Sequence, residues 1–429
     1  MNILVVGSGG REHALVWKLA QSAGATQIYC APGNPGIAEI AECVPIQAND
    51  TDGLLSFAIS RKIDLTVVGP EQPLAEGIVD RFQQQGQRIF GPTRQAAELE
   101  WSKRFAKDFM ARHSIPTASY RTFSLSSADD LQDYVRSLSG PIVLKADGLA
   151  AGKGVIVCAS KEEAAPALSE MMTMGSAADT IVVEEFLEGE EVSVFAIADG
   201  NHYVLLAPAQ DHKRALDGDR GKNTGGMGAY APANLVTREL LKSVEDEIIT
   251  PTLSGMAGEG RPYTGCLYVG LMITRGGPKV VEYNSRFGDP ETQVVLPLFR
   301  GDLLEVLDAA SCGTLDRIPQ QAVTEGAAVC VVLASGGYPG SYATGIPITG
   351  LAGLQPENGI VAFHAGTRID DGTLVTAGGR VLGITAFATQ GSVRDQIEVA
   401  YRAVREVSFE SMHYRNDIGR RSTFSSIHS

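Results

Sequence analysis

The first hundred residues alternate short apolar strands with helical segments, and this order constrains the fold more than any other feature. Residues 3–6, 27–30, 65–68 and 89–90 are predicted strands, and residues 11–21 a helix. Turn signals such as Gly69-Pro70 and Gly91-Pro92 follow the strands. Strands separated by helices form parallel sheets, which bind ligands at their carboxyl edge. We therefore expect an N-terminal doubly wound α/β domain with a site at that edge.

The rest of the chain is predicted to be of mixed α/β type. Ser102 begins a predicted helix that runs to about residue 112. Residues 120–187 then read as strand, helix, strand, glycine-rich loop, strand, helix and strand. Long strands and a helix near 237–256 follow, and glycine-punctuated strands at 327–334 and 380–387 precede a last helix near 393–406. This order predicts a small α+β lid, a central α+β domain and a mixed C-terminal domain.

Composition excludes several classes of protein. The chain has 36 basic and 50 acidic side chains and a net charge of −14, which disfavours general binding to nucleic acid or to anionic membranes. No apolar run approaches membrane-spanning length, and the first residues read as a strand rather than a leader. The six cysteines are scattered without a C-x-x-C pair, which indicates reduced thiols. We expect a soluble, cytoplasmic, monomeric protein whose partners are small molecules.

A row of polar side chains in residues 281–289 is the most informative local feature. In a strand, Glu282, Asn284 and Arg286 would share one face. Carboxylate and amide oxygens suit a Mg²⁺ ion that also carries substrate phosphates. The planar guanidinium of the arginine suits a carboxylate or a phosphoryl oxygen. The alternative is an edge strand with a solvated outer face.

The loop at residues 7–12 follows the first strand and opens the first helix. Its sequence, Gly-Ser-Gly-Gly-Arg-Glu, lacks the third glycine of a dinucleotide fingerprint, because Glu12 occupies that position. No ribose-binding acid follows the second strand either. What remains is a set of backbone N–H groups at a helix N-terminus, which favours a phosphate site. Glu71 follows the strand-end Gly69-Pro70 and is expected on the same rim; a plain tight turn is the alternative.

A second glycine loop lies between two strands within residues 142–157. It is not a Walker A loop, because no Ser or Thr follows Lys153 and a strand comes next. A hairpin flap that folds over phosphates, with Lys145 inside and Lys153 at its tip, is the functional interpretation. Gly148, Gly152 and Gly154 would permit close backbone approach. A hairpin without function is the alternative.

Two further segments favour a nucleotide site. Residues 182–191 form an apolar strand that breaks into acidic residues, where the backbone could read an adenine edge and a carboxylate could take ribose hydroxyls. Residues 210–228 contain Gln-Asp-His-Lys-Arg and a long polar loop, and long loops in compact domains tend to be functional. His212 is interpreted as an orienting group or substrate contact rather than a metal ligand, since no second histidine is near in sequence.

In this order, these motifs resemble the ATP-grasp ligases, and within them the phosphoribosylamine–glycine ligase (glycinamide ribonucleotide synthetase) family. The resemblance runs nearly end to end. It rests on GSGGREHA (7–14), APGNPG (31–36), VGPE (68–71), SKRFAKDFMARHSIPTA (102–118), LKADGLAAGKGV (144–155), VEEFLEGEE (183–191), QDHKR (210–214), NTGGMGAY (223–230), YTGCLYVGLM (263–272), EYNSRFGDPETQ (282–293), GGYPG (336–340), FHAGT (363–367) and NDIGRR (416–421).

The resemblance implies a four-part fold and an activity. The expected parts are an N-terminal doubly wound domain at 1–101, a linking helix at 102–119, an ATP-grasp lid with the glycine flap at 120–190, a central ATP-grasp domain at 191–324 and a C-terminal domain at 325–429. The implied activity is an ATP-dependent ligation of glycine to 5-phosphoribosylamine through glycyl phosphate, which gives glycinamide ribonucleotide in de novo purine biosynthesis.

The resemblance also assigns roles to residues. ATP contacts are expected at Lys103, Lys145, Gly152, Lys153, Gly154, Glu185, Phe186, Leu187, Glu190 and Glu191. Glu282 and Asn284 are expected to ligate Mg²⁺ or Mn²⁺. Glycine and phosphoribosylamine contacts are expected at Gly9, Gly10, Arg11, Glu12, Asn34, Glu71, Asp211, Arg286 and Gly288. Catalytic roles are expected for Arg286, Asp211 and Lys213.

Three other functions are alternatives to this one. Another purine-pathway ATP-grasp ligase or carboxylase is disfavoured, because the QDHKR and EYNSRFGDPETQ blocks match the glycine ligases best. A nicotinamide oxidoreductase is suggested only by the first strand–helix turn. A non-catalytic adenylate-sensing module would bind ATP without co-substrate-dependent ADP release.

Overall fold

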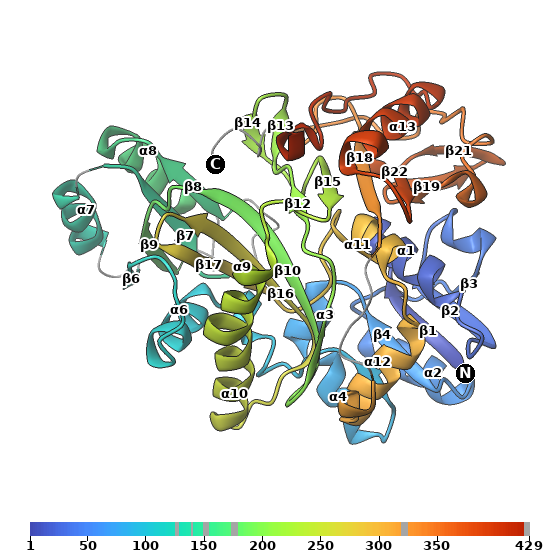
Figure 1. Ribbon diagram of the computed structural model, residues 1–429, viewed down its shortest axis with the longest axis horizontal. Helices are drawn as coiled ribbons and strands as arrows, with labels where there is room; N and C mark the ends of the chain where they lie inside the picture. Colours follow the sequence, from blue (N-terminus) through green and yellow to red (C-terminus); the bar gives the residue numbers. More distant parts are fainter. Residues whose placement is uncertain (125–127, 139, 149–153, 173–178, 319–324, 424–429) are drawn as a thin grey trace.

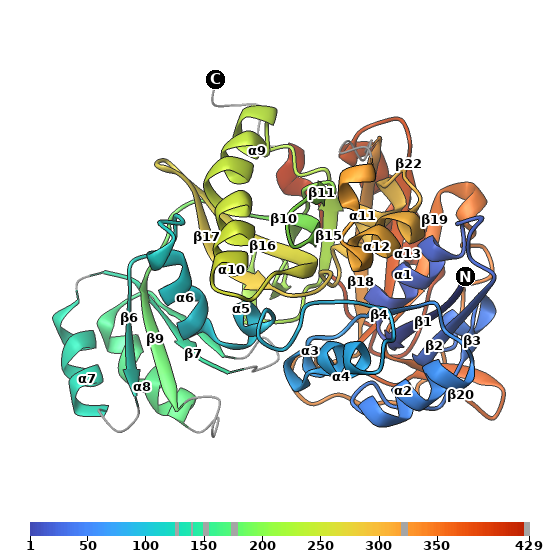
Figure 2. The ribbon, with the colours of Figure 1, turned by 90° about the horizontal axis from the view of Figure 1, so that it is seen from below.

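The computed structural model describes residues 1–124, 128–138, 140–148, 154–172, 179–318 and 325–423. It is a mixed α/β molecule in which the central part lies between the lid on one side and the N-terminal and C-terminal parts on the other (Figure 1). Figure 2 shows the lid at one end of the molecule, with the N-terminal sheet at the other. Among the described residues, no helix combines the length and the apolarity needed to cross a bilayer.

The N-terminal part holds the predicted parallel sheet. Its strands are β1 (Asn2–Gly7), β2 (Gln27–Pro32), β3 (Glu42–Cys43), β4 (Leu65–Val68) and β5 (Ile89–Phe90), in the order β3-β2-β1-β4-β5 and all parallel. The helices of this part are α1 (Gly10–Leu19), α2 (Thr51–Ser60), α3 (Glu71–Glu76), α4 (Ile78–Gln84) and α5 (Glu98–Trp101). The expectation of a doubly wound sheet is confirmed.

Side chains of β1 alternate between two hydrophobic cores, as the period of a strand requires. Leu4 and Val6 pack in a core with α2 and α4. Ile3 and Val5 face the opposite side, in a core that also contains residues of α11 (Thr292–Leu298) and α12 (Leu303–Cys312). Helices from much later in the chain therefore cover one face of the N-terminal sheet, which fixes that sheet against the central part.

The lid contains an antiparallel sheet and two helices. The strands are β6 (Tyr120–Ser124), β7 (Ile142–Ala146), β8 (Val155–Cys158) and β9 (Thr180–Glu185), in the order β6-β9-β7-β8. Helices α7 (Ala128–Ser137) and α8 (Lys161–Met172) pack with this sheet, and α6 (Lys103–Arg112), capped by Ser102 as predicted, leads into it. The order of elements in the lid is the predicted one.

The central sheet has the order β11-β10-β16-β17, with β10 (Glu190–Asp199), β11 (Tyr203–Leu205), β16 (Thr264–Thr274) and β17 (Gly277–Asn284). The helix predicted near 237–256 is present, but it is divided. A π-helical segment at Glu245–Ile249 joins α9 (Arg238–Val244) to α10 (Thr250–Gly258).

The C-terminal sheet has the order β12-β15-β18-β22-β19. Three of its strands, β18 (Ala327–Ala334), β19 (Ile360–His364) and β22 (Arg380–Ala388), belong to the C-terminal part, with helix α13 (Val393–Glu406) packed on them. The other two, β12 (Gln210–Asp211) and β15 (Gly228–Ala231), come from before residue 324, so this sheet crosses the expected domain boundary. The hairpins β13 (Arg214–Leu216)–β14 (Arg220–Asn223) and β20 (Thr367–Asp370)–β21 (Thr373–Thr376) complete the fold.

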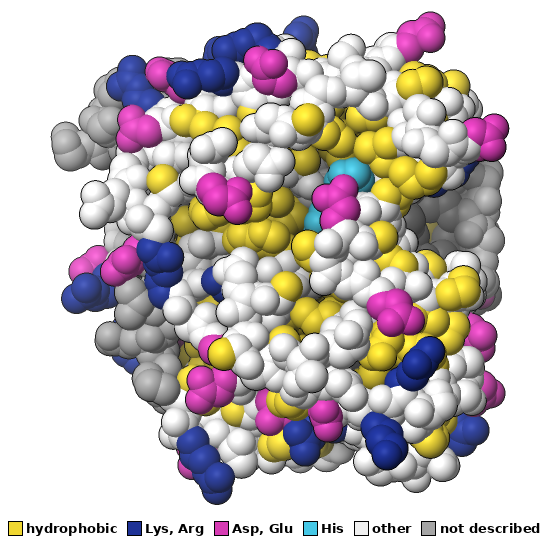
Figure 3. Space-filling view, turned by 90° about the vertical axis from the view of Figure 1, so that its right-hand side faces the viewer, with side chains coloured by type: hydrophobic (Ala, Val, Ile, Leu, Met, Phe, Trp, Pro, Cys, Tyr) yellow, Lys and Arg dark blue, Asp and Glu magenta, His cyan; other side chains and the backbone are white. Residues whose placement is uncertain are grey.

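The surface formed by the N-terminal and C-terminal parts carries mixed charge. Figure 3 shows Lys and Arg side chains interspersed with Asp and Glu on this face, and hydrophobic side chains near its middle. Where the side chains of this face are described, they form no continuous basic patch of the kind that binds a nucleic-acid backbone.

Candidate active site

A cavity of about 730 Å³ lies where the four parts meet. Its walls come from the N-terminal part, α6, the lid sheet, the central strands and the C-terminal part. Most of the residues expected at the site line it. They are Arg11, Glu71, Lys103, Lys145, Gly154, Glu185, Phe186, Leu187, Glu191, Asp211, Lys213, Glu282, Asn284 and Arg286.

Strand β17 presents the expected carboxylate and amide to the cavity. Val280 and Tyr283 of this strand are buried in the core, whereas Glu282 and Asn284 are only partly buried. The expectation that Arg286 lies in the same strand is wrong, because β17 ends at Asn284. The guanidinium nevertheless returns to the row, since Arg286 Nη2 donates to Asn284 Oδ1 at 3.1 Å.

A β-bulge in β17 connects the polar row to a buried lysine. Gly270 and Leu271 of β16 pair with Glu282 and Val280, so Val281 has no opposite partner. The carbonyl oxygen of Val281 instead accepts a hydrogen bond from Lys145 Nζ at 2.9 Å. The bulge therefore ties the strand that carries Glu282 to the lysine expected to contact ATP.

Lys145 belongs to a buried triad of charges at the lid side of the cavity. Its Nζ lies 3.0 Å from Glu184 Oε1, and Lys107 Nζ lies 2.8 Å from Glu184 Oε2. Lys107 also donates to Thr117 Oγ1 at 2.8 Å. Burial lowers the pKa of Lys107 to about 8, although Glu184 acts in the opposite direction. Two ammonium groups thus share one carboxylate, and the triad has a net positive charge that suits a polyphosphate.

The expected adenine hinge lies at the end of β9. Phe186 and Leu187 line the cavity together with Glu185. The carboxylate of Glu185 is engaged elsewhere, since it accepts from the Ser119 N–H at 3.0 Å and lies 3.2 Å from Lys279 Nζ. The hinge can therefore offer its backbone groups to a base, while its first side chain fixes the strand.

The glycine flap is described only in part. Gly154 is buried and lines the cavity, whereas Gly152 and Lys153 lie outside the described residues. Lys103, at the start of α6, donates to the carbonyl oxygen of Gly148 at 3.1 Å. Burial lowers the pKa of Lys103, an effect that Glu282 opposes.

Acidic side chains surround Lys213 in the middle of the cavity. Its Nζ contacts Glu191 Oε1 and lies 3.8 Å from Glu282 Oε1. Burial raises the pKa of Asp211, an effect that Lys213 opposes and that Glu291 strengthens. Although burial acts against it, Lys213 also helps lower the pKa of Glu282, which keeps that carboxylate ionised.

Two other expectations for this region are not met by the cavity lining. Glu190, expected as a nucleotide contact beside Glu191, is exposed and does not line the cavity. His212 is buried between two cavity residues but is not itself part of the lining. Because His212 is not part of the lining, its expected substrate contact finds no support. Within the described residues, neither of its ring nitrogens has a hydrogen-bond partner.

The far end of the cavity holds a cluster of ion pairs. Arg286 Nε lies 3.3 Å from Glu71 Oε2, and Arg286 Nη2 lies 3.2 Å from Glu100 Oε1. Arg11 Nη1 lies 3.8 Å from the same Glu71 oxygen. Burial by itself would raise the pKa of Glu71, but Arg286 and Arg11 bring it down to about 2. Glu71 is therefore an ionised hydrogen-bond acceptor at the cavity wall.

The first turn of α1 lies beside this cluster. Two side chains expected to contact substrate, Glu12 and Asn34, form hydrogen bonds within the protein instead. Glu12 accepts from the Gly9 N–H at 2.6 Å and from Arg11 Nε at 2.6 Å. Asn34 donates to the carbonyl oxygens of Ser8 at 2.8 Å and of His364 at 2.9 Å. Neither side chain is part of the cavity lining, so both hold the loop in place. Gly9, Gly10 and Gly288 likewise lie outside the lining.

The structure also adds residues that sequence reasoning missed. Glu184 immediately precedes the expected hinge, and its position is a signal that a close reading of the VEEF segment could have used. Lys107, Glu100, Glu291, Asp289 and Arg380 line the cavity too. Their ion-pair partners come from distant segments, as with Lys107 and Glu184 or Asp289 and Arg380.

The donor set fits a divalent cation that is shared with substrate. Among the described residues, no group of three His, Cys, Asp or Glu side chains could hold a metal by itself. Glu282 and Asn284 supply one carboxylate and one amide oxygen, and Mg²⁺ usually binds through one or two carboxylates plus substrate phosphates and water. These two residues are therefore suited to hold Mg²⁺ only together with a nucleotide.

Sequence comparison covers nearly the whole chain. Residues 1–100 match the N domain of phosphoribosylglycinamide synthetase, residues 101–292 its ATP-grasp (A) domain and residues 328–421 its C domain. The chain belongs to the phosphoribosylglycinamide synthetase family. Among its relatives in this family, the phosphoribosylamine–glycine ligase of Chlorobaculum tepidum is 51% identical over 98% of this chain and 99% of that protein. The enzyme of the same name from Vibrio vulnificus is 50% identical, with 98% of each chain covered.

Solved structures agree with this family assignment. The crystal structure of phosphoribosylamine–glycine ligase from Thermotoga maritima aligns with a TM-score of 0.82 at 34% identity, and covers 97% of this chain and 100% of that chain. The biotin carboxylase domain of the Hydrogenobacter thermophilus 2-oxoglutarate carboxylase, solved with ADP and magnesium, aligns with a TM-score of 0.73. It covers 96% of this chain and 91% of that one at 16% identity, so this likeness concerns the fold alone.

Proposed function

We propose that this protein is an ATP-dependent ligase that joins glycine to 5-phosphoribosylamine in purine biosynthesis, with glycinamide ribonucleotide, ADP and phosphate as products. The observation that carries this proposal is the composition of the cavity where the four parts meet. Its lid side has a hinge and the lysines expected for ATP, its middle has the carboxylate–amide pair for a metal, and its far end has ionised carboxylates beside a helix N-terminus. The names of the relatives agree with it.

In this proposal the nucleotide lies between the lid and the central sheet. The backbone of Phe186 and Leu187 meets the adenine, Glu191 the ribose, and Lys103 and Lys145 the phosphates. Glu282 and Asn284 would hold Mg²⁺, which would supply charge neutralisation at the transferred phosphoryl group; Mn²⁺ in its place stays a prediction from the sequence.

The chemistry requires activation of glycine, because a carboxylate is a poor electrophile. A carboxylate oxygen of glycine attacks the γ-phosphorus of ATP, and the bond from that phosphorus to the bridging oxygen breaks, so that ADP leaves. The amine of phosphoribosylamine then attacks the acyl carbon, phosphate leaves with the C–O bonding electrons, and the new amide nitrogen loses a proton. The protein contributes positioning and charge stabilisation in these steps.

Three residues have distinct tasks in this scheme. Arg286 is placed to hold the glycine carboxylate, because its guanidinium lies beside Asn284. Lys213 lies between Glu191 and Glu282. From there its ammonium group can stay in contact with the phosphoryl group during the transfer. Asp211 faces the same cavity and is proposed to orient the glycine amino group.

The sugar amine is proposed to lie at the far end. Backbone N–H groups of the first turn of α1 are suited to its phosphate, because the helix dipole favours an anion there. Arg11 and Glu71 lie between this turn and Arg286. Cytoplasmic location and a monomeric state stay predictions from the sequence.

The deciding experiment is an omission assay of ADP release. The purified protein is incubated with ATP, Mg²⁺, glycine and freshly prepared phosphoribosylamine, and each component is left out in turn. We expect ADP release only when all four are present. Release that ignores glycine but depends on another acid would overturn the substrate assignment, and no release under any combination would favour a binding module.

A further inference from the structure

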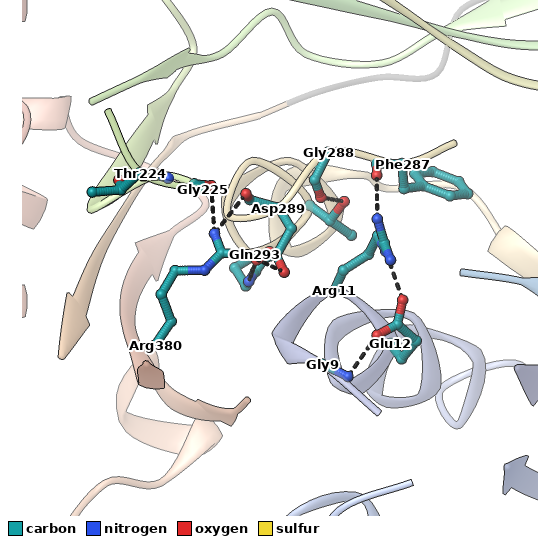
Figure 4. A network of polar contacts seen from close by, with 12 residues as sticks. Gly9, Arg11, Glu12, Thr224, Gly225, Phe287, Gly288, Asp289, Gln293 and Arg380 are labelled. Atoms are coloured by element: carbon teal, nitrogen blue, oxygen red, sulfur yellow. Dashed lines mark hydrogen bonds and ion pairs between the residues drawn. The ribbon is translucent and has the colours of Figure 1, made fainter. Parts of the chain in front are cut away.

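Two glycine-containing turns from different parts of the chain, one at Gly9 and one at Gly225-Gly226, converge near Asp289. A Cβ atom on Gly9 would lie 3.7 Å from Asp289 Oδ2, and one on Gly226 would lie 2.4 Å from Cδ of the adjoining Pro290. A Cβ atom on Gly225 would lie 3.0 Å from Cζ of Arg380. Figure 4 shows this convergence, with Asp289 between α1 on one side and Arg380 on the other. The turns pack so closely that the position of the Asp289 carboxylate is fixed.

Two side chains hold this carboxylate in its orientation. Arg380 Nη2 donates to Asp289 Oδ2 at 2.9 Å, and Gln293 Nε2 donates to Asp289 Oδ1 at 2.7 Å (Figure 4). Arg380 Nη1 also donates to the backbone oxygens of Asp289, at 2.8 Å, and of Gly225. Arg380 comes from β22, so the C-terminal part positions a residue of the segment that follows the metal-binding strand.

The carboxylate keeps capacity to bind a ligand. Each of its oxygens accepts one hydrogen bond from the partners above, and a carboxylate has about four acceptor sites in total. Asp289 is 18% exposed at its side chain and lines the cavity. Although burial acts against it, Arg380 and Arg11 lower its pKa, so the group is ionised at neutral pH.

The location of Asp289 indicates which part of the ligand it meets. It lies beside Gly9, at the turn proposed for the phosphate, and three residues after Arg286, which is proposed to hold glycine. In the sugar amine, the ribose ring lies between the phosphate group and the amino group. An ionised carboxylate repels a phosphate but accepts strong hydrogen bonds from hydroxyl groups.

We propose that Asp289 accepts hydrogen bonds from the ribose hydroxyl groups of the sugar-amine substrate, and that Arg380 is the positioning residue that holds it. This inference rests on the proposed function, because it names the ligand of the far end of the same cavity. Through Arg380, it assigns the C-terminal part an indirect task in substrate recognition, which the motifs of the sequence did not indicate.

The test measures binding of ribose 5-phosphate and its 2-deoxy and 3-deoxy counterparts, without ATP, by calorimetry. A hydrogen bond to an ionised group contributes about 1.5–3 kcal/mol, so we expect Asp289→Asn to weaken binding of ribose 5-phosphate by about 10–100-fold. The deoxy compound that lacks the bonded hydroxyl should bind wild type and Asp289→Asn almost equally. The hydrogen bond between Asp289 and that hydroxyl is already missing in the complex of wild type with this compound, so the substitution removes nothing further. In turnover assays, KM for phosphoribosylamine should rise while KM for ATP and for glycine stays unchanged.

Matched controls separate recognition from stability. Asp370→Asn and Arg368→Met break an exposed ion pair of the same C-terminal part, and both should bind all three compounds as wild type does. Arg380→Lys keeps the charge but loses the two-pronged contact, and should reduce the preference for ribose over the deoxy compound. This variant also serves if Asp289→Asn does not fold.

Two results would overturn the inference. If folded Asp289→Asn or Arg380→Lys discriminates ribose 5-phosphate from both deoxy compounds as strongly as wild type, Asp289 does not bind a hydroxyl group. If KM for ATP rises together with KM for phosphoribosylamine, the effect is a general one on the cavity. Neither result affects the proposed function as long as ADP release by wild type needs ATP, Mg²⁺, glycine and phosphoribosylamine. If wild type releases ADP without one of these components, the proposed function itself is refuted.

Discussion

At the scale of single residues, the ATP side of the cavity depends on how buried charges are shared. Glu184 forms ion pairs with both Lys107 and Lys145, and all three side chains are at most 5% exposed. A buried carboxylate is costly unless it is paired, so Lys107 has an effect beyond packing. Lys107 neutralises the carboxylate of Glu184, so the positive charge of Lys145 remains available to a ligand.

Replacing Lys107 by Met should weaken ATP binding at least about 10-fold, because Lys145 would become the only cation beside Glu184 and the charge offered to the phosphates would fall by one unit. Titration of the protein with ATP, followed by intrinsic fluorescence, measures this. Lys242→Met, which breaks an exposed pair with Asp246, is the matched control and should leave ATP affinity unchanged. An ATP affinity of Lys107→Met equal to wild type would contradict the shared-charge argument.

Glu282 is the residue on which the metal assignment depends most. Its side chain is 33% exposed and lies beside Lys213, and Glu282 is not one of the residues of the adjoining hydrophobic core. Glu282→Ala should therefore keep the thermal unfolding temperature but lower kcat on the order of 100-fold, since charge stabilisation of the transferred group is lost. Mn²⁺ binding in the presence of ATP, measured by electron paramagnetic resonance, should weaken in parallel. Near-normal turnover in a folded variant would refute the assignment.

At the scale of elements, the first turn of α1 is held in a narrow space between two other parts of the chain. A Cβ atom on Gly10 would lie 2.6 Å from Gln293 Nε2 and 3.8 Å from Cβ of Ala365. Gln293 is almost fully buried and is also bonded to Asp289, so it cannot move away freely. The glycine is therefore required by the approach of α11 rather than by helix formation.

Gly10→Ala should raise KM for phosphoribosylamine, because the new methyl group displaces Gln293 and with it Asp289. Gly258→Ala is the matched control at another helical glycine, where a Cβ atom would meet nothing within 4 Å. That control should stabilise the protein by up to about 1 kcal/mol, the difference in helix propensity, without changing the kinetics. Chemical unfolding and steady-state kinetics of both variants test this; equal behaviour of the two would contradict the packing argument.

At the scale of the whole molecule, the N-terminal and C-terminal parts meet through a buried histidine pair. His13 of α1 accepts a hydrogen bond at its Nδ1 from the backbone N–H of His364, at 2.8 Å. The ring of His13 also packs edge-on against Phe363 of β19. Burial, helped by repulsion from His364, lowers the pKa of His13 to about 3. The contact therefore needs a neutral His13.

This contact should make the protein sensitive to acid. Above the unfolded-state pKa of about 6.5, His13 is neutral in both states and contributes no pH dependence. As the pH falls from 6.5 toward 3, the unfolded state binds a proton that the native state does not, so the free energy of unfolding falls by about 1.4 kcal/mol per pH unit. Urea denaturation between pH 7.5 and 4.5 measures the slope. His13→Asn keeps a hydrogen-bond acceptor and should flatten the slope by that amount; an unchanged slope would show that His13 is not the responsible group.

The sequence by itself determined the features that depend on neighbouring residues. The alternation of strand and helix predicted the parallel sheet, because the period of hydrophobic residues is a local property. The Ser102 cap and the order of elements in the lid followed in the same way. Most of the expected site residues also line one cavity, because the family motifs place them at strand ends and loops.

Only the tertiary structure decided how these residues are used. The bulge at Val281 frees a carbonyl oxygen for Lys145, and the end of β17 before Arg286 turns that guanidinium to Asn284. Glu12 looked like a substrate group, but its carboxylate closes the first turn of α1. Lys107 and Arg380 gain their importance from partners far away in the chain. Such contacts depend on how separate elements pack, and no local pattern specifies which carboxylate a lysine or an arginine will meet.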